Sequence, residues 1–385
     1  MHDTEYVVQG CQSRFGKDGQ DIAMPGAATR KNQIEWINSI KGACMVLVVF
    51  LHVSLWADTA FGPSTWKSVS LFLIPFRIPV FFVVSGILAA GSVMHNRPKA
   101  MRRALNIYFV YLVWTTVVTL RLHATPDPSD DPNLIAYFTN ALVPGHYWYL
   151  WALPVYYGAS MIMRRIHGNM WLWLPVAFGL YVFAAPLADF MAGVFSQPAE
   201  VPYWAKTISC FWWFFLGLCA AGSLVAFGGG TIGRPALQWL NRPPGRAALA
   251  LFAVAGIAVL SVYRVDLAGM REMAVTFCYI AIAFTAFPAL AGTGPERVLA
   301  MIGRNTLPVY IFHKLILIVI MAAESRIRLP ATVSSIPVDV IVTVLAVALI
   351  VLSIGIGRLV KASPFAFLLN GIFQPRGSSS KTVSA

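Results

Sequence analysis

Long apolar stretches alternate with short polar segments along most of the chain. An α-helix needs about 20 residues to cross the roughly 30 Å hydrocarbon core of a bilayer, and stretches of that length recur. Ten of them can be delimited, at 38–57, 68–91, 104–122, 146–163, 170–187, 206–227, 246–263, 272–291, 305–323 and 337–359. The pattern predicts an all-α, polytopic membrane protein with about ten transmembrane helices.

The composition supports this prediction. Hydrophobic residues make up 58% of the 385 residues, charged residues only 12%, and the mean hydropathy is +0.68. Soluble domains carry about twice that share of charged residues. The lipid bilayer is therefore the expected surrounding of most of the chain.

The distribution of charge predicts the orientation, because basic loops are retained on the cytoplasmic side. If the N-terminus is cytoplasmic, 20 of the 29 lysines and arginines fall inside and seven outside, whereas ten of the 16 acids fall outside. We expect a multi-pass protein of the cell (inner or plasma) membrane with both termini cytoplasmic. The net charge of +13 is then explained by basic loops beside an anionic leaflet, and no nucleic-acid partner is expected.

The chain is expected to form one membrane domain with two tails. Residues 1–37 form a polar cytoplasmic tail that we expect to be disordered, residues 38–359 form the domain, and residues 360–385 form a second cytoplasmic tail. The five cysteines show no metal-ligand spacing, so neither a metal nor a permanently bound cofactor is expected.

Ionisable residues inside predicted spans are the first candidates for function, because a charge in hydrocarbon is costly unless it is paired, wetted or directed inward. Four such residues stand out, namely His52, Arg77 and the adjacent His313 and Lys314.

Lys41 and His52 in the first span are 11 residues apart, which is close to three whole helical turns. Both side chains therefore project from one face, with a rise between them of about 16 Å. This register predicts a polar track from the cytoplasmic interface to beyond the middle of the membrane. The alternatives are a lysine that snorkels to the interface and a histidine that makes a structural hydrogen bond.

Arg77 enters the second span from its outer end and reaches a depth within about two turns of His52. The ninth span carries His313 and Lys314 to mid-bilayer, with Tyr310 three residues before His313. His313 is either a satisfied interior histidine or a functional one. The role of Lys314, which points about 100° away from His313, stays open.

The segment Gly145–Tyr157 begins the fourth span at the outer interface with a run of aromatic residues. An interfacial aromatic belt explains them without any further function. The alternative is an aromatic surface that stacks on a sugar acceptor, with His146, Trp148 and Tyr149 as its residues.

Four segments together resemble acyltransferase family 3, whose members are multi-helix membrane enzymes that acylate cell-envelope carbohydrates and related acceptors. "WINSIKGACMVLVVFLH" resembles the opening motif of the family, with Lys41 and His52 at its [KR]-x10-H spacing. "FRIPVFFVVSGIL", "HYWYLWAL" and "IGRNTLPVYIFHK" resemble later motifs in the same order. The resemblance implies a ten-helix fold. Asn38 departs from the opening motif, because the family usually has aspartate at this position.

The resemblance implies an acyl-CoA donor, usually acetyl-CoA, and an acceptor hydroxyl of a carbohydrate or glycolipid. Lys41, with Arg102 and Arg103, is expected to hold the CoA phosphates. His52 is expected to act as general base or to carry the acyl group as an acyl-imidazole. Arg77 would stabilise the oxyanion or position the acceptor.

His313 and Tyr310 are expected to orient His52 or the acceptor, because no predicted span contains an internal aspartate or glutamate. The alternative class is a secondary transporter or flippase of a small anionic or sugar-containing solute. The lack of intramembrane carboxylates counts against an ion-coupled carrier. The acceptor, the acyl chain length and the oligomeric state are not determined by the sequence.

Overall fold

The structure is a computed structural model that describes residues 27–124, 142–145, 147–195, 201–232, 235–262, 270–324 and 336–373. Within these ranges the chain is helical and contains no strand. The elements in chain order are α2 (Ala27–Ala60), α3 (Thr65–Phe72), α4 (Ile74–His95), α5 (Arg97–Ala124), α7 (Trp148–Ile166), η1 (Met170–Trp173), α8 (Leu174–Val182), α9 (Ala184–Val194), α10 (Val201–Cys219), α11 (Ala221–Gly229), η3 (Pro235–Asn241), α12 (Pro243–Val262), α13 (Met270–Ala289), α14 (Gly294–Arg304), α15 (Thr306–Glu324), α17 (Val338–Ala362), η4 (Pro364–Ala366) and α18 (Phe367–Asn370).

Helices with the length and composition of membrane spans account for most of the fold. Six described helices are long and apolar enough to cross a membrane, or up to eight spans if each of two bent pairs counts as one. The bent pairs are residues 170–194, with a 72° break before α9, and residues 201–229, with a 68° break between α10 and α11. The fold is that of a polytopic membrane protein, while the number of ten spans and the cytoplasmic position of the termini stay predictions.

Nine of the ten predicted stretches correspond to a helix or a bent pair, whereas the stretch 68–91 covers the end of α3 and most of α4, and several boundaries differ. Helix α2 begins at Ala27 and so includes residues that the sequence assigned to the tail. Residues 1–26 and 374–385 lie outside the described residues, so the disorder of the tails is not tested there. The segment between the eighth and ninth spans, expected to be a loop, forms helix α14 instead.

Helix α14 escaped prediction because it is short and contains three charged residues, Glu296, Arg297 and Arg304. Its start is set by local chemistry, since Thr293 Oγ1 accepts a hydrogen bond from the Glu296 backbone N–H and the Glu296 carboxylate accepts from the Gly292 N–H at 2.6 Å. A pattern of apolar length alone does not detect such a helix.

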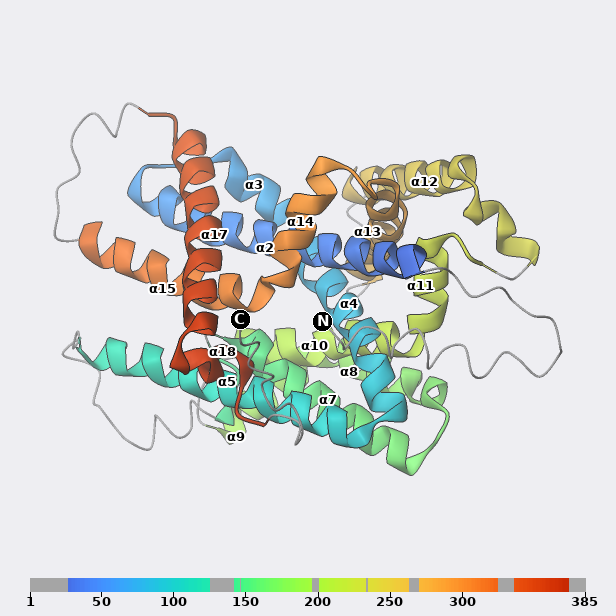
Figure 1. Cartoon of the computed structure of the whole chain (residues 1–385), viewed down its shortest axis with the longest axis horizontal. Helices are drawn as coiled ribbons and strands as arrows, with labels where there is room; N and C mark the ends of the chain where they lie inside the picture. The colour runs from blue at the N-terminus through green and yellow to red at the C-terminus, as the bar shows by residue number, and fades with distance from the viewer. Residues whose placement is uncertain are drawn as a thin grey trace, which may run out of the picture.

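Figure 1 shows α5 and α7 along the lower edge of the molecule, α12 at the upper right, and α17 crossing α2. The crossing of α4 and α10 lies in the largest apolar cluster, where Phe82, Phe214 and Phe215 are fully buried. A Cβ added at Gly86 would lie 1.9 Å from the Phe214 carbonyl oxygen, so only glycine permits this approach of the two helices.

Helices α2 and α14 pack against each other more extensively than any other pair described. A Cβ at Gly303 would lie 1.8 Å from the Asn38 carbonyl oxygen, and one at Gly42 would lie 1.9 Å from the Leu299 carbonyl oxygen. Close backbone contact explains why both residues of this crossing are glycine.

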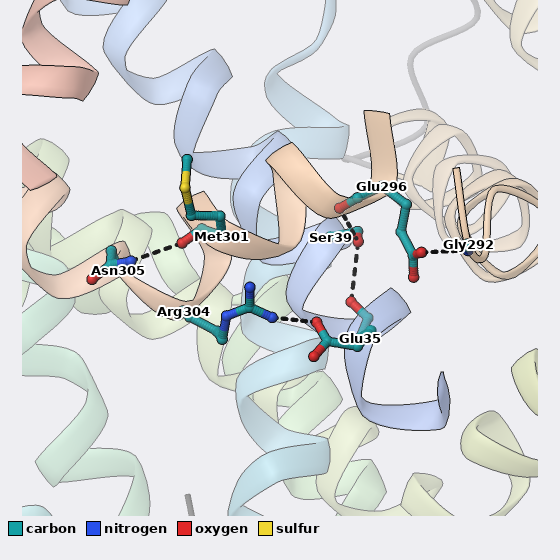
Figure 2. Close-up of polar contacts among 7 residues, drawn as sticks. All are labelled: Glu35, Ser39, Gly292, Glu296, Met301, Arg304 and Asn305. Atoms are coloured by element: carbon teal, nitrogen blue, oxygen red, sulfur yellow. Dashed lines mark hydrogen bonds and ion pairs between the residues drawn. The ribbon is translucent and has the colours of Figure 1, made fainter. Parts of the chain in front are cut away.

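Polar contacts also join α2 to α14, as Figure 2 shows. The Ser39 hydroxyl contacts two backbone carbonyl oxygens, that of Glu35 at 3.0 Å and that of Glu296 at 3.2 Å. Glu35 also forms an ion pair with Arg304 at the end of α14. Because Asn305 follows directly and α15 begins at Thr306, this contact fixes where α15 starts relative to α2.

Candidate active site

The two residues of the [KR]-x10-H spacing lie on one uninterrupted helix, α2, so the helical register assumed for them holds. Both side chains are partly buried. The Lys41 ammonium makes no hydrogen bond or ion pair with a described residue, and the charge of Arg103 acts on it. Lys41 is thus a lysine held inside the protein beside a second cation.

His52 meets His313 from α15. The two ring centroids are 5.4 Å apart and the planes are tilted by 37°. His313 is completely buried, and its Nδ1 lies 2.6 Å from the Val309 carbonyl oxygen. Because a carbonyl only accepts, this contact assigns the proton of the neutral ring to Nδ1 and leaves Nε2 as an acceptor. Among the described residues Nε2 has no partner.

Tyr310 lies beside this pair. Its ring centroid is 6.2 Å from that of His313 and 5.6 Å from that of Tyr149. The Tyr310 hydroxyl is buried and makes no hydrogen bond with a described residue. Two hydrogen-bonding atoms close to the His52–His313 contact, His313 Nε2 and Tyr310 Oη, therefore have no hydrogen-bond partner among the described residues.

Tyr149 and Trp148, predicted to contact the substrate, lie against α4. The Tyr149 hydroxyl is 3.0 Å from Ser85 Oγ, and its ring packs on Phe81 and Phe82 at centroid distances of 4.9 and 5.1 Å. Trp148 packs on Phe82 at 5.7 Å. Tyr149 reaches Tyr310 and so joins the site, whereas His146 lies outside the described residues.

Arg77 is buried, with 3% of its surface exposed. Its guanidinium lies 3.5 Å from two backbone carbonyl oxygens, those of Leu47 and Ser70, and forms no ion pair with a described carboxylate. Distances of 3.5 Å are at the limit of a hydrogen bond, so most of the donor capacity of the guanidinium is unused. Leu47 lies five residues before His52 in α2, so Arg77 and His52 lie in the same region of the bundle.

Arg102 and Arg103 were expected at the cytoplasmic mouth with Lys41. Arg103 donates to the Leu88 carbonyl oxygen at 3.3 Å and lies near Lys41. Arg102 donates to the Pro98 carbonyl oxygen, one turn earlier in its own helix, at 3.4 Å. Thus Arg103 lies beside Lys41, while no described contact joins Arg102 to Lys41.

The carboxylates nearest to the site in sequence, within the part of the chain that the structure describes, pair with other residues and not with His52. Asp58, the nearest acid along the sequence, pairs with Lys67 of α3 at 2.5 Å. Glu35 pairs with Arg304, where it supplies a negative charge three residues before Asn38. Within the described residues, no three His, Cys, Asp or Glu side chains gather as a metal site requires.

Three residues near the site were missed or left without a role by the sequence. Tyr147 is fully buried, its hydroxyl donates to the Ile311 carbonyl oxygen at 3.3 Å, and its ring is 5.9 Å from that of Tyr310. Lys314 Nζ lies 5.9 Å from the Tyr147 ring centroid. Lys206 of α10 is close enough for its charge to act on His52 and on Lys314. The sequence analysis did not single out Tyr147, because an interfacial aromatic belt explained the whole aromatic run.

Comparison with known proteins agrees with the motif resemblance. The family model of acyltransferase 3, described as an acyltransferase domain, matches residues 34–355. The chain is 26% identical over 311 residues to "Inner membrane protein YcfT" of Escherichia coli (strain K12), and this alignment covers 73% of the chain and 79% of that protein. No solved structure matches the chain. Because the family match extends over most of its length, the chain belongs to the acyltransferase 3 family and is a membrane acyltransferase that transfers groups other than aminoacyl groups.

Proposed function

We propose that the protein is an O-acyltransferase of the inner or plasma membrane that moves an acyl group, in the simplest case acetyl, from cytoplasmic acyl-CoA to a hydroxyl of a cell-envelope carbohydrate or related acceptor. The observation that carries this proposal is the contact of His52 with His313. His52 lies on the same helix as Lys41, whose ammonium has no partner among the described residues, and in the same region as Arg77. The three tasks of the reaction each have a suitable residue in this region: Lys41 for binding the donor, His52 for general-base catalysis and Arg77 for stabilising the oxyanion.

At the cytoplasmic end, Lys41 and Arg103 bind the phosphates of CoA, with Arg102 nearby in α5. Two cations held close together without a described carboxylate partner for Lys41 repel each other, and an anionic donor relieves that repulsion. Phosphates are recognised by such charge-assisted hydrogen bonds. The rise of about 16 Å along α2 then separates the phosphates from the reacting thioester.

His52 acts as the general base. It takes the proton from the acceptor hydroxyl while the hydroxyl oxygen forms a bond to the thioester carbonyl carbon. The C–S bond then breaks and the proton passes from His52 to the sulfur, which leaves as the CoA thiol. Arg77 stabilises the negative charge that develops on the carbonyl oxygen, because its guanidinium is buried and its donors are largely unused.

His313 positions His52, because its Nε2 acceptor is fixed by the bond of Nδ1 to Val309. Tyr310 and Tyr149 line the path to the acceptor, and Trp148 of α7 lies next to Tyr149, packed against Phe82 of α4. The sugar ring of the acceptor is expected to stack on these aromatic faces.

The test uses purified protein in proteoliposomes with radiolabelled acetyl-CoA and envelope glycans from a strain that lacks the gene. We expect label transfer by the wild type and a ~10²–10⁴-fold loss of kcat in His52→Ala, the range for removal of a general base. His95→Ala, at an exposed histidine near the end of α4, is the matched control and should retain activity. Full transfer by His52→Ala would refute its role, and solute uptake without label transfer would favour a transporter.

A further inference from the structure

Helix α3 lies at the end of the bundle predicted to face outward, and its N-terminus is held by two side chains. Asp339 of α17 accepts hydrogen bonds from the Thr65 backbone N–H at 2.8 Å and from the Trp66 backbone N–H at 3.4 Å. The Ser64 hydroxyl accepts from the Lys67 backbone N–H at 3.2 Å. The first N–H groups of an α-helix have no partner within the helix, so Ser64 and Asp339 together satisfy three of them.

Further contacts fix α3 to its neighbours. Trp66 Nε1 donates to Thr343 Oγ1 at 3.0 Å, and the Thr343 hydroxyl donates to the Asp339 carbonyl oxygen, one turn earlier in α17, at 2.7 Å. The Trp66 ring packs on that of Phe50 in α2, with the centroids 4.6 Å apart. Helix α3 therefore lies beside both α2 and α17, as Figure 1 shows, and the Asp339 carboxylate joins the backbone of α3 to α17.

The other end of α3 meets Arg77. The Nη1 atom of Arg77 lies 3.5 Å from the Ser70 carbonyl oxygen, which belongs to the last turn of α3. The carbonyl oxygens at the C-terminus of a helix carry partial negative charge, so a cation beside them is stabilised even where the distance is at the limit of a hydrogen bond. Arg77 forms no ion pair with a described carboxylate, and the end of α3 supplies negative charge for this buried cation.

The connection between α3 and α4 is short. Leu73 alone separates the two helices, its N–H donates to the Val69 carbonyl oxygen at 3.0 Å, and its carbonyl oxygen accepts from the Arg77 backbone N–H at 2.9 Å. A single residue supplies only two soft dihedral angles. A displacement of α3 therefore changes the position of the Ser70 carbonyl relative to Arg77, because no flexible loop absorbs it.

We infer that Asp339 is a positioning residue for the reaction. It holds the N-terminus of α3, the C-terminal turn of α3 presents the Ser70 carbonyl oxygen, and this oxygen keeps the Arg77 guanidinium in place at the candidate site. The inference rests on the role proposed for Arg77 and adds a residue that lies outside the site. Asp339 also lies in the first turn of α17, where a carboxylate stabilises its own helix, so the variants below separate the two effects.

The first experiment measures kcat with radiolabelled acetyl-CoA in proteoliposomes. We expect Asp339→Ala to lower kcat roughly 5- to 30-fold, less than the ~10²-fold that a misplacement of 1 Å can cost, with the KM for acetyl-CoA unchanged. Asp339→Asn keeps an oxygen acceptor for both N–H groups and should stay within about twofold of the wild type. Glu272→Ala, which removes an exposed acid from the first turn of α13, is the matched control and should keep its kcat. Equal kcat values for Asp339→Ala and the wild type would overturn the inference.

The second experiment is a double-mutant cycle with Arg77→Gln. If Asp339 acts through Arg77, Asp339→Ala should change kcat by less than about twofold once the guanidinium is absent, because two residues in one chain of contacts have non-additive effects. Damage that reaches the site by another route would lower kcat by the same factor in both backgrounds. That result would show that Asp339 is structural and would overturn the inference.

Hydrogen exchange separates failure of this inference from failure of the proposed function, because it needs no substrate. Asp339→Ala should speed amide exchange in residues 64–73 about five- to tenfold. Arg77→Gln should speed it about twofold or more, because the C-terminus of α3 loses its cation. If both variants do so while the wild type transfers no acyl group, the link from Asp339 to Arg77 stands and the proposed reaction fails. If acyl transfer proceeds but neither variant changes this exchange, the reaction stands and the inference fails.

Discussion

Two regions along α2 differ in whether their buried polar groups have hydrogen-bond partners. Where α2 meets α14, Glu35 pairs with Arg304 and the Ser39 hydroxyl finds two carbonyl oxygens. Around His52, the Nε2 of His313 and the hydroxyl of Tyr310 are buried without a described partner. Buried polar groups are almost always hydrogen-bonded in folded proteins, so an unpartnered cluster indicates where a ligand or a reaction is accommodated.

The comparison separates the polar residues that join α2 to α14 from the polar residues to which the proposed function assigns the chemistry. The contact of α2 with α14 is largely satisfied, although one oxygen of the Glu296 carboxylate has no described partner. Hydrogen bonds and ion pairs at the glycine crossing of α2 and α14 stabilise the packing of the two helices. His313 Nε2 and the Tyr310 hydroxyl make no hydrogen bond with a described residue, so they add no such stability. Changes in the first region should therefore reduce stability, and changes in the second should reduce activity.

After His52→Ala, the largest effect in the second region is expected from Arg77→Gln. Removal of a preorganised donor at a developing oxyanion typically costs about 10²–10³ in kcat, and we expect a loss of that size. Arg164→Gln, at an arginine near the end of α7 and away from the site, should retain wild-type kcat. Both variants are assayed with radiolabelled acetyl-CoA in proteoliposomes. A kcat within a factor of two of the wild type would show that Arg77 is structural.

Gly303→Ala should give the largest effect in the first region. The new Cβ would lie 1.8 Å from the Asn38 carbonyl oxygen, so α14 must move away from α2. Overpacking of this kind lowers the free energy of unfolding by about 1–3 kcal/mol. Thermal unfolding in detergent measures it, with Gly355→Ala as control, because no atom lies within 4 Å of a Cβ at that exposed position. Equal melting temperatures would mean that α2 and α14 are not in close contact.

His313 allows a sharper test, because two substitutions each keep a different nitrogen position. Asparagine retains a donor for the Val309 carbonyl, and glutamine places a polar atom where Nε2 lies. If Nε2 positions His52, we expect His313→Asn to lower kcat ~10- to 100-fold, as misplacement of a reacting group does, and His313→Gln to lose less. The KM for acetyl-CoA should stay the same in both. The reverse order of the two variants would show that the bond to Val309, rather than Nε2, matters.

Glu35→Gln should give the smallest effect. The ion pair with Arg304 is partly exposed, with 28% of the Glu35 side chain and 48% of the Arg304 side chain accessible. Exposed pairs contribute about 0–1 kcal/mol, so the melting temperature should fall only slightly and kcat should not change. A loss of activity as large as that of His313→Asn would erase the distinction between the two regions.

The sequence predicted the helical membrane architecture, and it singled out the residues of the candidate site, because both steps depend on local chemistry. Apolar length identified the helices, and the rarity of ionisable groups in such helices singled out His52, Arg77, His313 and Lys314. The period of the α-helix placed Lys41 and His52 on one face, and motif order identified the family.

Which residues meet was decided only by the tertiary structure. The pairing of His52 with His313, the contact of Tyr147 with Lys314 and the packing of α14 on α2 depend on contacts between residues far apart in the chain. Helical periodicity fixes the face of a side chain within its own helix, but the neighbour of that face is set by the way helices pack. At the crossing of α2 and α14, glycines and capping residues set that packing. The length of an apolar stretch gives no information about either.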